Sequence, residues 1–197
     1  MLKKIIKKLT SKHFWQRNIY MIAIVSTLLA IVAISVVFMV GGQQDVGAKQ
    51  AGEQIVELAQ NIRNQYKTRP DFWGLSTKEI IKRKIFSSSM VVVGNQLIGY
   101  FDNPIEIGND EKGTPVMPTS RKFVVAYKGL NKQQCISLAT LKFDPNFWLG
   151  VLAMDIRNEN NMQTFDWSNK EFMLPADKTE VKKICQNRNN TIVFHFE

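Results

Sequence analysis

Residues Ile19–Val40 read IYMIAIVSTLLAIVAISVVFMV and carry no charged side chain over twenty-two positions. As an α-helix this stretch is about 33 Å long, which is enough to cross a hydrocarbon core of roughly 30 Å. Thirteen of its residues are Ile, Val, Leu or Phe, and together they favour membrane insertion by about 4 to 8 kcal/mol. The sequence therefore predicts a transmembrane helix in a segment spanning residues 19–42.

Two other interpretations of this stretch are weaker. A cleaved secretory signal has a shorter apolar region of about 7 to 15 residues and ends in a small-x-small site, whereas Met39 occupies the −3 position of the candidate bond after Gly41. A buried helix of a soluble core would carry a polar face, and none is present here. We expect a retained anchor.

The net charge of +9 is concentrated before the anchor. Residues 1–18 contain six Lys or Arg and no carboxylate, which leaves twenty basic and seventeen acidic residues in the rest of the chain. The positive-inside rule predicts that 1–18 is a cytoplasmic segment and that residues 43–197 lie outside the cytoplasm, in a periplasm-like space. A nucleic-acid or polybasic lipid patch is the alternative, but topology alone accounts for the segment, so no nucleic-acid partner is expected.

Beyond the anchor, the apolar residues form a stripe. Ile55, Leu58 and Ile62 recur at helical spacing, which predicts an amphipathic helix from about residue 43 to 67. With a kink at Gly41-Gly42, anchor and amphipathic helix would form one rod of roughly 70 Å. We expect the domain's own sheet to cover most of the stripe.

The rest of the chain alternates short strands with short helices and contains no internal repeat. The β-branched and aromatic runs are bounded by Gly, Pro and Asn, as in antiparallel strands, so the predicted fold class is α+β. The expected elements are helices over Thr77–Lys84 (capped by Ser76, with Glu79 as its capping-box partner), after Asn131 and over Asp177–Gln186; a turn over 108–113 between two short strands; and strands over 123–127, 148–156 and 191–196.

Cys135 and Cys185 are the only cysteines. A disulfide between them would close a loop of about fifty residues and stabilise the domain by up to roughly 4 kcal/mol. Two free thiols are the alternative, but an oxidising compartment would not preserve them. Redox catalysis is not expected, because the chain has no Cys-x-x-Cys motif.

No set of residues in the sequence suits catalysis. His13 and His195 are the only histidines, and the predicted topology puts them on opposite sides of the membrane. The run Ser87–Ser89 lacks the surroundings of a nucleophile elbow, and Glu53 with Glu57 reads as a solvated helix face. We therefore expect no enzyme, no metal, no cofactor and no small-molecule substrate.

The segment Gly129–Thr140, GLNKQQCISLAT, resembles the Gly-Leu-x-x-x-x-Cys helix of type IVb pilins, a group that includes the toxin-coregulated, bundle-forming and conjugative thin-pilus pilins. Val181–Cys185, followed by Thr191–Phe196, looks like their second cysteine and closing strand. Looser similarities are Gly74–Thr77, to their αβ-loop, and Asn103–Gly108, to an Asn-Pro strand lead-in. The resemblance covers about residues 50–197. It implies a long N-terminal helix, half transmembrane and half amphipathic, packed on an antiparallel sheet, with Cys135 and Cys185 bounding a disulfide-linked region.

The N-terminus departs from this family. Pilin precursors are cut after a Gly just before the apolar segment and carry a Glu at the fifth mature position, whereas here no Gly precedes Gly41 and the first carboxylate is Asp45. The sequence therefore has no evident processing site. It also lacks the carboxylate that would pair with a neighbour's terminal amine.

The resemblance implies a membrane-anchored, non-enzymatic subunit of a type IVb pilus or of a related secretion or conjugation apparatus. Its partners would be inner-membrane lipid and other pilin-like or pilus-assembly proteins. Two alternatives remain open: a true type IVb pilin processed at an atypical site, and a membrane-tethered periplasmic binding or sensor module. An adhesive role on a surface filament is compatible with the pilin interpretations.

Overall fold

The computed structural model describes residues 25–30, 46–141 and 150–197. The chain divides into two units, 1–43 and 44–197. In the first unit residues 25–30 are helical, and the remainder of the predicted anchor lies outside the described residues, as does its junction with the amphipathic helix. No helix within the described part of the chain has both the length and the apolar character needed to cross a membrane.

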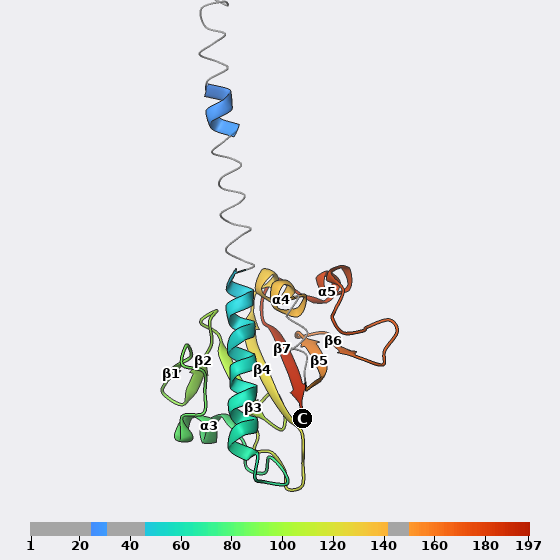
Figure 1. Ribbon diagram of the computed structural model, residues 1–197. Helices are drawn as coiled ribbons and strands as arrows, with labels where there is room; N and C mark the ends of the chain where they lie inside the picture. The colour runs from blue at the N-terminus through green and yellow to red at the C-terminus, as the bar shows by residue number, and fades with distance from the viewer. Residues whose placement is uncertain (1–24, 31–45, 142–149) are drawn as a thin grey trace, which may run out of the picture. The chain divides into compact units, whose positions relative to one another are not determined.

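An amphipathic helix opens the second unit and runs over residues 46–66 (Figure 1). Its apolar stripe is buried: Ile55, Leu58 and Ile62 are fully shielded from solvent. Charged side chains such as Lys49 occupy the exposed face. The helix predicted from the stripe is confirmed over these residues.

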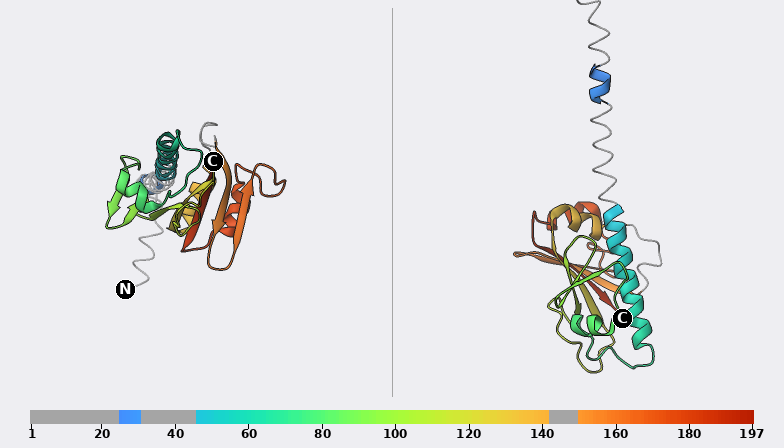
Figure 2. Two further views of the ribbon diagram at one scale, coloured as in Figure 1. Left: turned by 90° about the horizontal axis from the view of Figure 1, so that it is seen from below. Right: turned by 90° about the vertical axis from the view of Figure 1, so that its left-hand side faces the viewer.

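The stripe packs against one face of a seven-stranded sheet, as the two views in Figure 2 show. The strand order is β1-β2-β3-β4-β7-β5-β6, and every pairing between these strands is antiparallel. The strands are β1 (Val91–Val93), β2 (Gln96–Ile98), β3 (Pro104–Gly108), β4 (Phe123–Leu130), β5 (Val151–Arg157), β6 (Met162–Asp166) and β7 (Asn190–Phe196). The predicted arrangement of a helix on an antiparallel sheet is confirmed.

The central strands β4 and β7 build the core under the helix. Their register pairs Val125 with Phe194 and Tyr127 with Ile192, so alternate residues of both strands point to the helix side. The Tyr127 hydroxyl accepts a hydrogen bond from the Phe101 N–H at 3.0 Å, and burial raises the pKa of this phenol to about 12. The Tyr127 ring is thus held within the core by its attachment to β4 and by the hydrogen bond at its hydroxyl.

Three short helices accompany the sheet. They are α3 (Thr77–Arg83), α4 (Lys132–Ala139) and α5 (Lys178–Ile184). Ser76, Asn131 and Asp177 cap them, as expected, by accepting backbone N–H bonds with their side chains. One detail differs: Glu79 pairs with Arg83 one turn later, where the sequence suggested a bond back to the Ser76 backbone.

Polar side chains of the amphipathic helix hold the chain before β1 and just after β2 by hydrogen bonds. The Gln54 amide donates to the Ser89 carbonyl at 3.0 Å and accepts from the Tyr100 N–H at 2.8 Å, while the Ser87 hydroxyl donates to Glu57. Glu57 lies on the exposed face of the helix, as predicted, and its carboxylate in addition accepts this bond from the chain before β1.

The observed strands differ from the predicted ones at two places. β6 was not predicted, because its exposed Met162 and polar neighbours give only a weak alternation. The turn after β3 forms, with the Asn109 N–H donating to the Thr114 carbonyl at 2.8 Å, but no second short strand follows it before β4. Pro115 and Pro118 lack the N–H groups that a ladder needs.

Candidate functional site: the disulfide-bounded region

A disulfide joins α4 to the end of α5. Cys135 and Cys185 are both buried, with Cα atoms 6.0 Å apart and a separation of fifty positions in the sequence. The two helices lie side by side (Figure 1). The closed loop includes β5, β6 and α5, so the bond ties one whole edge of the sheet to the core beneath α4.

Asn190 fastens the chain just after the second cysteine. This fully buried side chain donates to the Leu130 carbonyl at 2.9 Å and to the Gln186 carbonyl at 2.8 Å, and it accepts from the Gln186 N–H at 2.8 Å. All three hydrogen bonds join the Asn190 side chain to main-chain atoms. They hold the end of β4 next to the start of β7. The position of β7 relative to the disulfide depends on this side chain.

The sheet face opposite the amphipathic helix carries a polar network centred on Asp155 of β5. The Asp155 carboxylate is 3% exposed and accepts hydrogen bonds from Arg157 at 2.6 Å and from the Thr164 hydroxyl at 2.8 Å. His195 Nε2 lies 3.0 Å from the same carboxylate. Arg157 in turn pairs with Glu111, from the loop after β3. The network links β5, β6, β7 and this loop.

These bonds decide the protonation of Asp155. Burial alone would raise the pKa of the carboxyl, but hydrogen bonds from His195, Arg157 and Thr164 outweigh burial and lower this pKa to about 2. The carboxylate is therefore charged at any physiological pH. It lies directly opposite Val193 in the register, next to a small apolar cluster on this face of the sheet.

The His195–Asp155 pair does not form a nucleophile–base set. The Thr164 hydroxyl donates to Asp155, and within the described residues the imidazole has no hydroxyl or thiol partner. Nor do the described residues contain a group of three or more His, Cys, Asp or Glu side chains placed to hold a metal ion. The network is suited to holding strands together.

The outer edge of the disulfide-bounded region presents apolar side chains to solvent. Met162 of β6 is 59% exposed, and Trp167 and Met173, in the turn that follows, are about half exposed. The Trp167 indole is oriented by a bond to the Val151 carbonyl at 2.7 Å. Exposed large apolar groups on an edge strand are typical of protein contact surfaces.

A polar cavity of about 560 Å³ lies beside the disulfide. Its walls come from Lys132 at the start of α4, from Glu159 after β5, and from the segment 186–189 that follows Cys185. Asn189 donates to Glu159 at 3.2 Å across it. Three parts of the sequence thus line one hollow, and the disulfide helps to bring them together.

Sequence reasoning identified the two cysteines and missed the polar network. His195 was set aside because its only fellow histidine, His13, lies in the segment predicted to be cytoplasmic. The register of β7 nevertheless aligns His195 with β5, where Asp155 lies. The available indication was the alternation around Met154 and Ile156, which makes Asp155 and Arg157 face the other way. Strand order, which brings β7 beside β5, was not readable from that pattern.

Comparison with known proteins agrees with this fold. A family model described as Bundlin matches residues 44–155. A type IVb pilin from Salmonella typhi is 16% identical, with a TM-score of 0.49 over 73% of this chain and 95% of that chain. TcpA, a type IV pilin from Vibrio cholerae El Tor biotype, is 10% identical, with a TM-score of 0.53 over 77% of this chain and 99% of that chain. Comparison with curated protein sequences finds no match.

The likeness to TcpA shows a shared fold, since sequence identity is low. The family match is stronger evidence of relationship, because it spans over half of the chain. It includes the amphipathic helix, α4 with Cys135, and most of the sheet. On that evidence the chain belongs to the bundlin family.

Proposed function

We propose that this chain is a structural, non-catalytic subunit of a type IVb pilus or of a related secretion or conjugation apparatus. The observation that carries the proposal is the match of residues 44–155 to the bundlin family, over a fold in which a helix packs on a disulfide-braced antiparallel sheet. Its work is to present a rigid surface to other pilin-like or assembly proteins. The exposed Met162 and Trp167 at the β6 edge are candidate contact residues.

The proposed subunit is held in the bacterial inner membrane by Ile19–Val40. Six basic residues in 1–18 and a charge-free stretch of twenty-two residues support a single-pass anchor with a cytoplasmic N-terminus. The domain over 43–197 then lies in the periplasm, where oxidation supports the disulfide. Inner-membrane lipid is a partner in this arrangement.

The same N-terminus favours a subunit that keeps its anchor. Residues 1–40 contain no Gly and residues 1–44 no carboxylate, so this stretch offers no evident site for the usual pilin processing. We infer a role at the tip, at the base or within the membrane-bound part of the apparatus. A filament-forming pilin cut at an atypical site is the competing assignment.

Mass measurement of the protein extracted from native membranes tests this inference. The expected product retains residues 1–18 and the apolar stretch, and it is recovered with the membrane after filaments are sheared from the cells. A product beginning near residue 18–22, present in the sheared fraction, would assign a processed filament pilin. In-cell crosslinking should join the chain to other pilin-like or assembly proteins, and capture of none of these would contradict the proposal.

A matched pair of variants distinguishes loss of a contact surface from a general disturbance of the fold. Met162→Asp is expected to reduce the crosslinks, whereas Val91→Asp, at the opposite edge of the sheet and equally exposed at 59%, should leave them unchanged. Both variants must retain the disulfide. Equal effects of the two variants would count against the β6 edge as the contact surface.

A further inference from the structure

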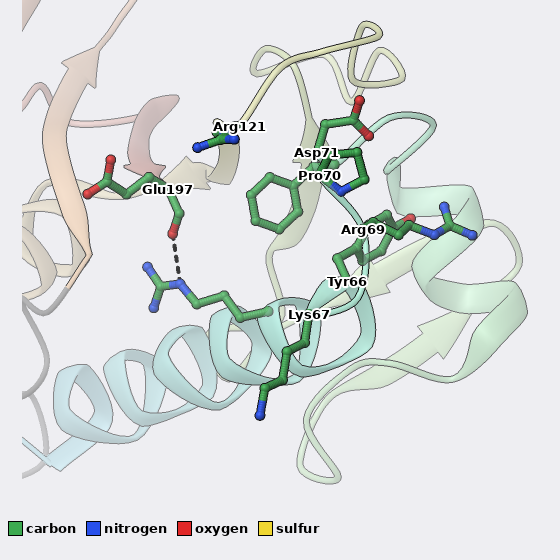
Figure 3. A pocket seen from close by; sticks show the side chains of 9 residues that line it. Tyr66, Lys67, Arg69, Pro70, Asp71, Arg121 and Glu197 are labelled. Carbon is green, nitrogen blue, oxygen red and sulfur yellow. Dashed lines mark hydrogen bonds between the residues drawn. The ribbon is translucent and has the colours of Figure 1, made fainter.

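A second cavity lies at the other end of the amphipathic helix, away from the disulfide. It has a volume of about 420 Å³, within the range of small-ligand sites. Its walls are the last turn of the helix, the following segment 69–72, Arg121 before β4, and Glu197 after β7 (Figure 3). Three distant parts of the sequence therefore meet around one hollow.

Positive charge dominates the walls of this cavity. Arg63, Lys67, Arg69 and Arg121 line the cavity together with two residues that carry side-chain carboxylates, Asp71 and Glu197. The Asp71 carboxylate already accepts N–H bonds from Trp73 at 3.2 Å and from Thr119 at 2.9 Å, which commits it to the turn. The cavity therefore retains an excess of positive charge.

The four cations differ in what already holds them. Arg63 donates to the Glu197 carbonyl at 2.8 Å and lies over the Phe196 ring, and Arg69 lies over the Tyr66 ring. Arg121, in contrast, makes no ion pair or side-chain hydrogen bond with any residue the structure describes. In Figure 3 it lies on the same side of the hollow as Glu197, while Lys67 and Arg69 extend outward at the rim.

The floor of the cavity is apolar and rigid. The half-buried Phe72 ring packs between Tyr66, at 5.7 Å between centroids, and Phe123, at 4.7 Å. Pro70 lines the hollow beside it. Apolar groups and an unpaired guanidinium in the walls of one cavity suit a ligand with one apolar face and one anionic group.

We propose that this cavity binds an acidic sugar of the uronic acid class. Arg121 would take the carboxylate in a two-pronged bond, since its planar guanidinium matches that geometry. The sugar's hydrogen-bearing carbon face would lie on Phe72 and Pro70, and its hydroxyls would donate to the free lone pairs of Asp71 and Glu197. A phosphate dianion fits less well, because Lys67 and Arg69 extend outward at the rim and the two carboxylates would repel its second charge.

This inference is independent of pilus membership, because it concerns the purified chain alone. Three ligands on one sugar scaffold test it: glucuronate, glucose and glucose 6-phosphate. Binding to the full chain in uncharged detergent micelles is followed by ligand-detected NMR titration at low salt. Glucuronate should bind with saturation, glucose 6-phosphate should bind more weakly, and glucose should not bind detectably.

The decisive variant is Arg121→Gln, which is expected to weaken glucuronate binding at least about tenfold. The matched control is Arg188→Gln, an exposed arginine at the rim of the cavity beside the disulfide, which removes the same charge and should leave binding unchanged. Arg121→Lys, which keeps the charge and loses the planar fork, should give an intermediate affinity.

Three results would overturn the proposal. They are the absence of saturable glucuronate binding, tighter binding of glucose 6-phosphate than of glucuronate, and equal losses in Arg121→Gln and Arg188→Gln. Because Arg121 is exposed and unpaired, its variants should unfold at the wild-type temperature. If Arg121→Gln alone failed to fold, glucuronate protection of the wild-type chain from modification by phenylglyoxal, mapped to Arg121, would decide the question.

Discussion

Removal of the Asp155 charge tests whether the polar network holds the outer face of the sheet together. The pKa of this carboxyl is lowered from 3.8 to about 2 by His195, Arg157 and Thr164. That difference corresponds to about 2 kcal/mol of folding stability. Solvent screening reduces this stabilisation only a little, because the Asp155 side chain is only 4% exposed. Asp155→Asn should therefore lower the free energy of unfolding at pH 7 by at least about 2 kcal/mol.

The pH dependence has a defined sign. A carboxyl whose pKa is lowered by folding contributes its full stabilisation above the unfolded value of 3.8, and the contribution disappears as the pH falls through about 2. The pKa values of Asp110, Asp166 and Asp177 are also lowered, by hydrogen bonds that outweigh burial. For this reason the informative quantity is the difference in unfolding free energy between wild type and Asp155→Asn. It should shrink by about 2 kcal/mol between pH 5 and pH 2.

Urea unfolding of the full chain in uncharged detergent, with the disulfide intact and circular dichroism as readout, measures this difference. Asp102→Asn is the matched control, because it removes a carboxylate from the exposed β2–β3 turn. The control should differ from wild type by less than about 0.5 kcal/mol at pH 7. A gap between wild type and Asp155→Asn that stays constant from pH 5 to pH 2, or that the control reproduces, would refute the reasoning.

The remaining predictions concern the disulfide and the core. Replacing Cys135 and Cys185 together by Ala should lower the unfolding free energy by about 4 kcal/mol, because the loop of fifty residues regains its chain entropy; coincident urea curves for the oxidised, reduced and variant proteins would contradict this. Asn190→Ala should cost about 2 to 3 kcal/mol in the same measurement, because it leaves buried backbone groups unpaired, and a loss below about 0.5 kcal/mol would count against it. Leu58→Ala, in the fully buried stripe, should cost about 2 to 5 kcal/mol, while Gln60→Ala on the exposed face should cost under about 0.5 kcal/mol; equal effects would mean that the stripe is not packed.

Local pattern was sufficient for most of the helices. Apolar spacing of three and four residues around Ile55 and Leu58 specified the amphipathic helix, since that spacing places side chains on one face of a helix. Ser76, Asn131 and Asp177 marked three helix starts, because a short polar side chain satisfies the free N–H groups there. These features depend on neighbours within about one turn of the chain.

Strands were less readable where their partners were remote. β7 stood out as a β-branched and aromatic run, and the structure places it between β4 and β5. β6 was not predicted from the sequence, because a short edge strand buries few side chains and needs little alternation of apolar and polar residues. The outward-facing Val124 and Val193 likewise gave no sign of the small second cluster that they form with Ala126.

Residue types and their spacing along the chain were enough to predict the charge-free stretch, the striped helix, the helix caps and the single possible pairing of two cysteines. Which side chains meet across the sheet and at the ends of the helix became known from the fold. Asp155 gained His195 through strand order, and Arg121 gained its place opposite the end of the amphipathic helix through the path of the loop before β4. These contacts join residues forty or more positions apart. Their free energy depends on burial and on the geometry between the groups, and spacing along the chain encodes neither.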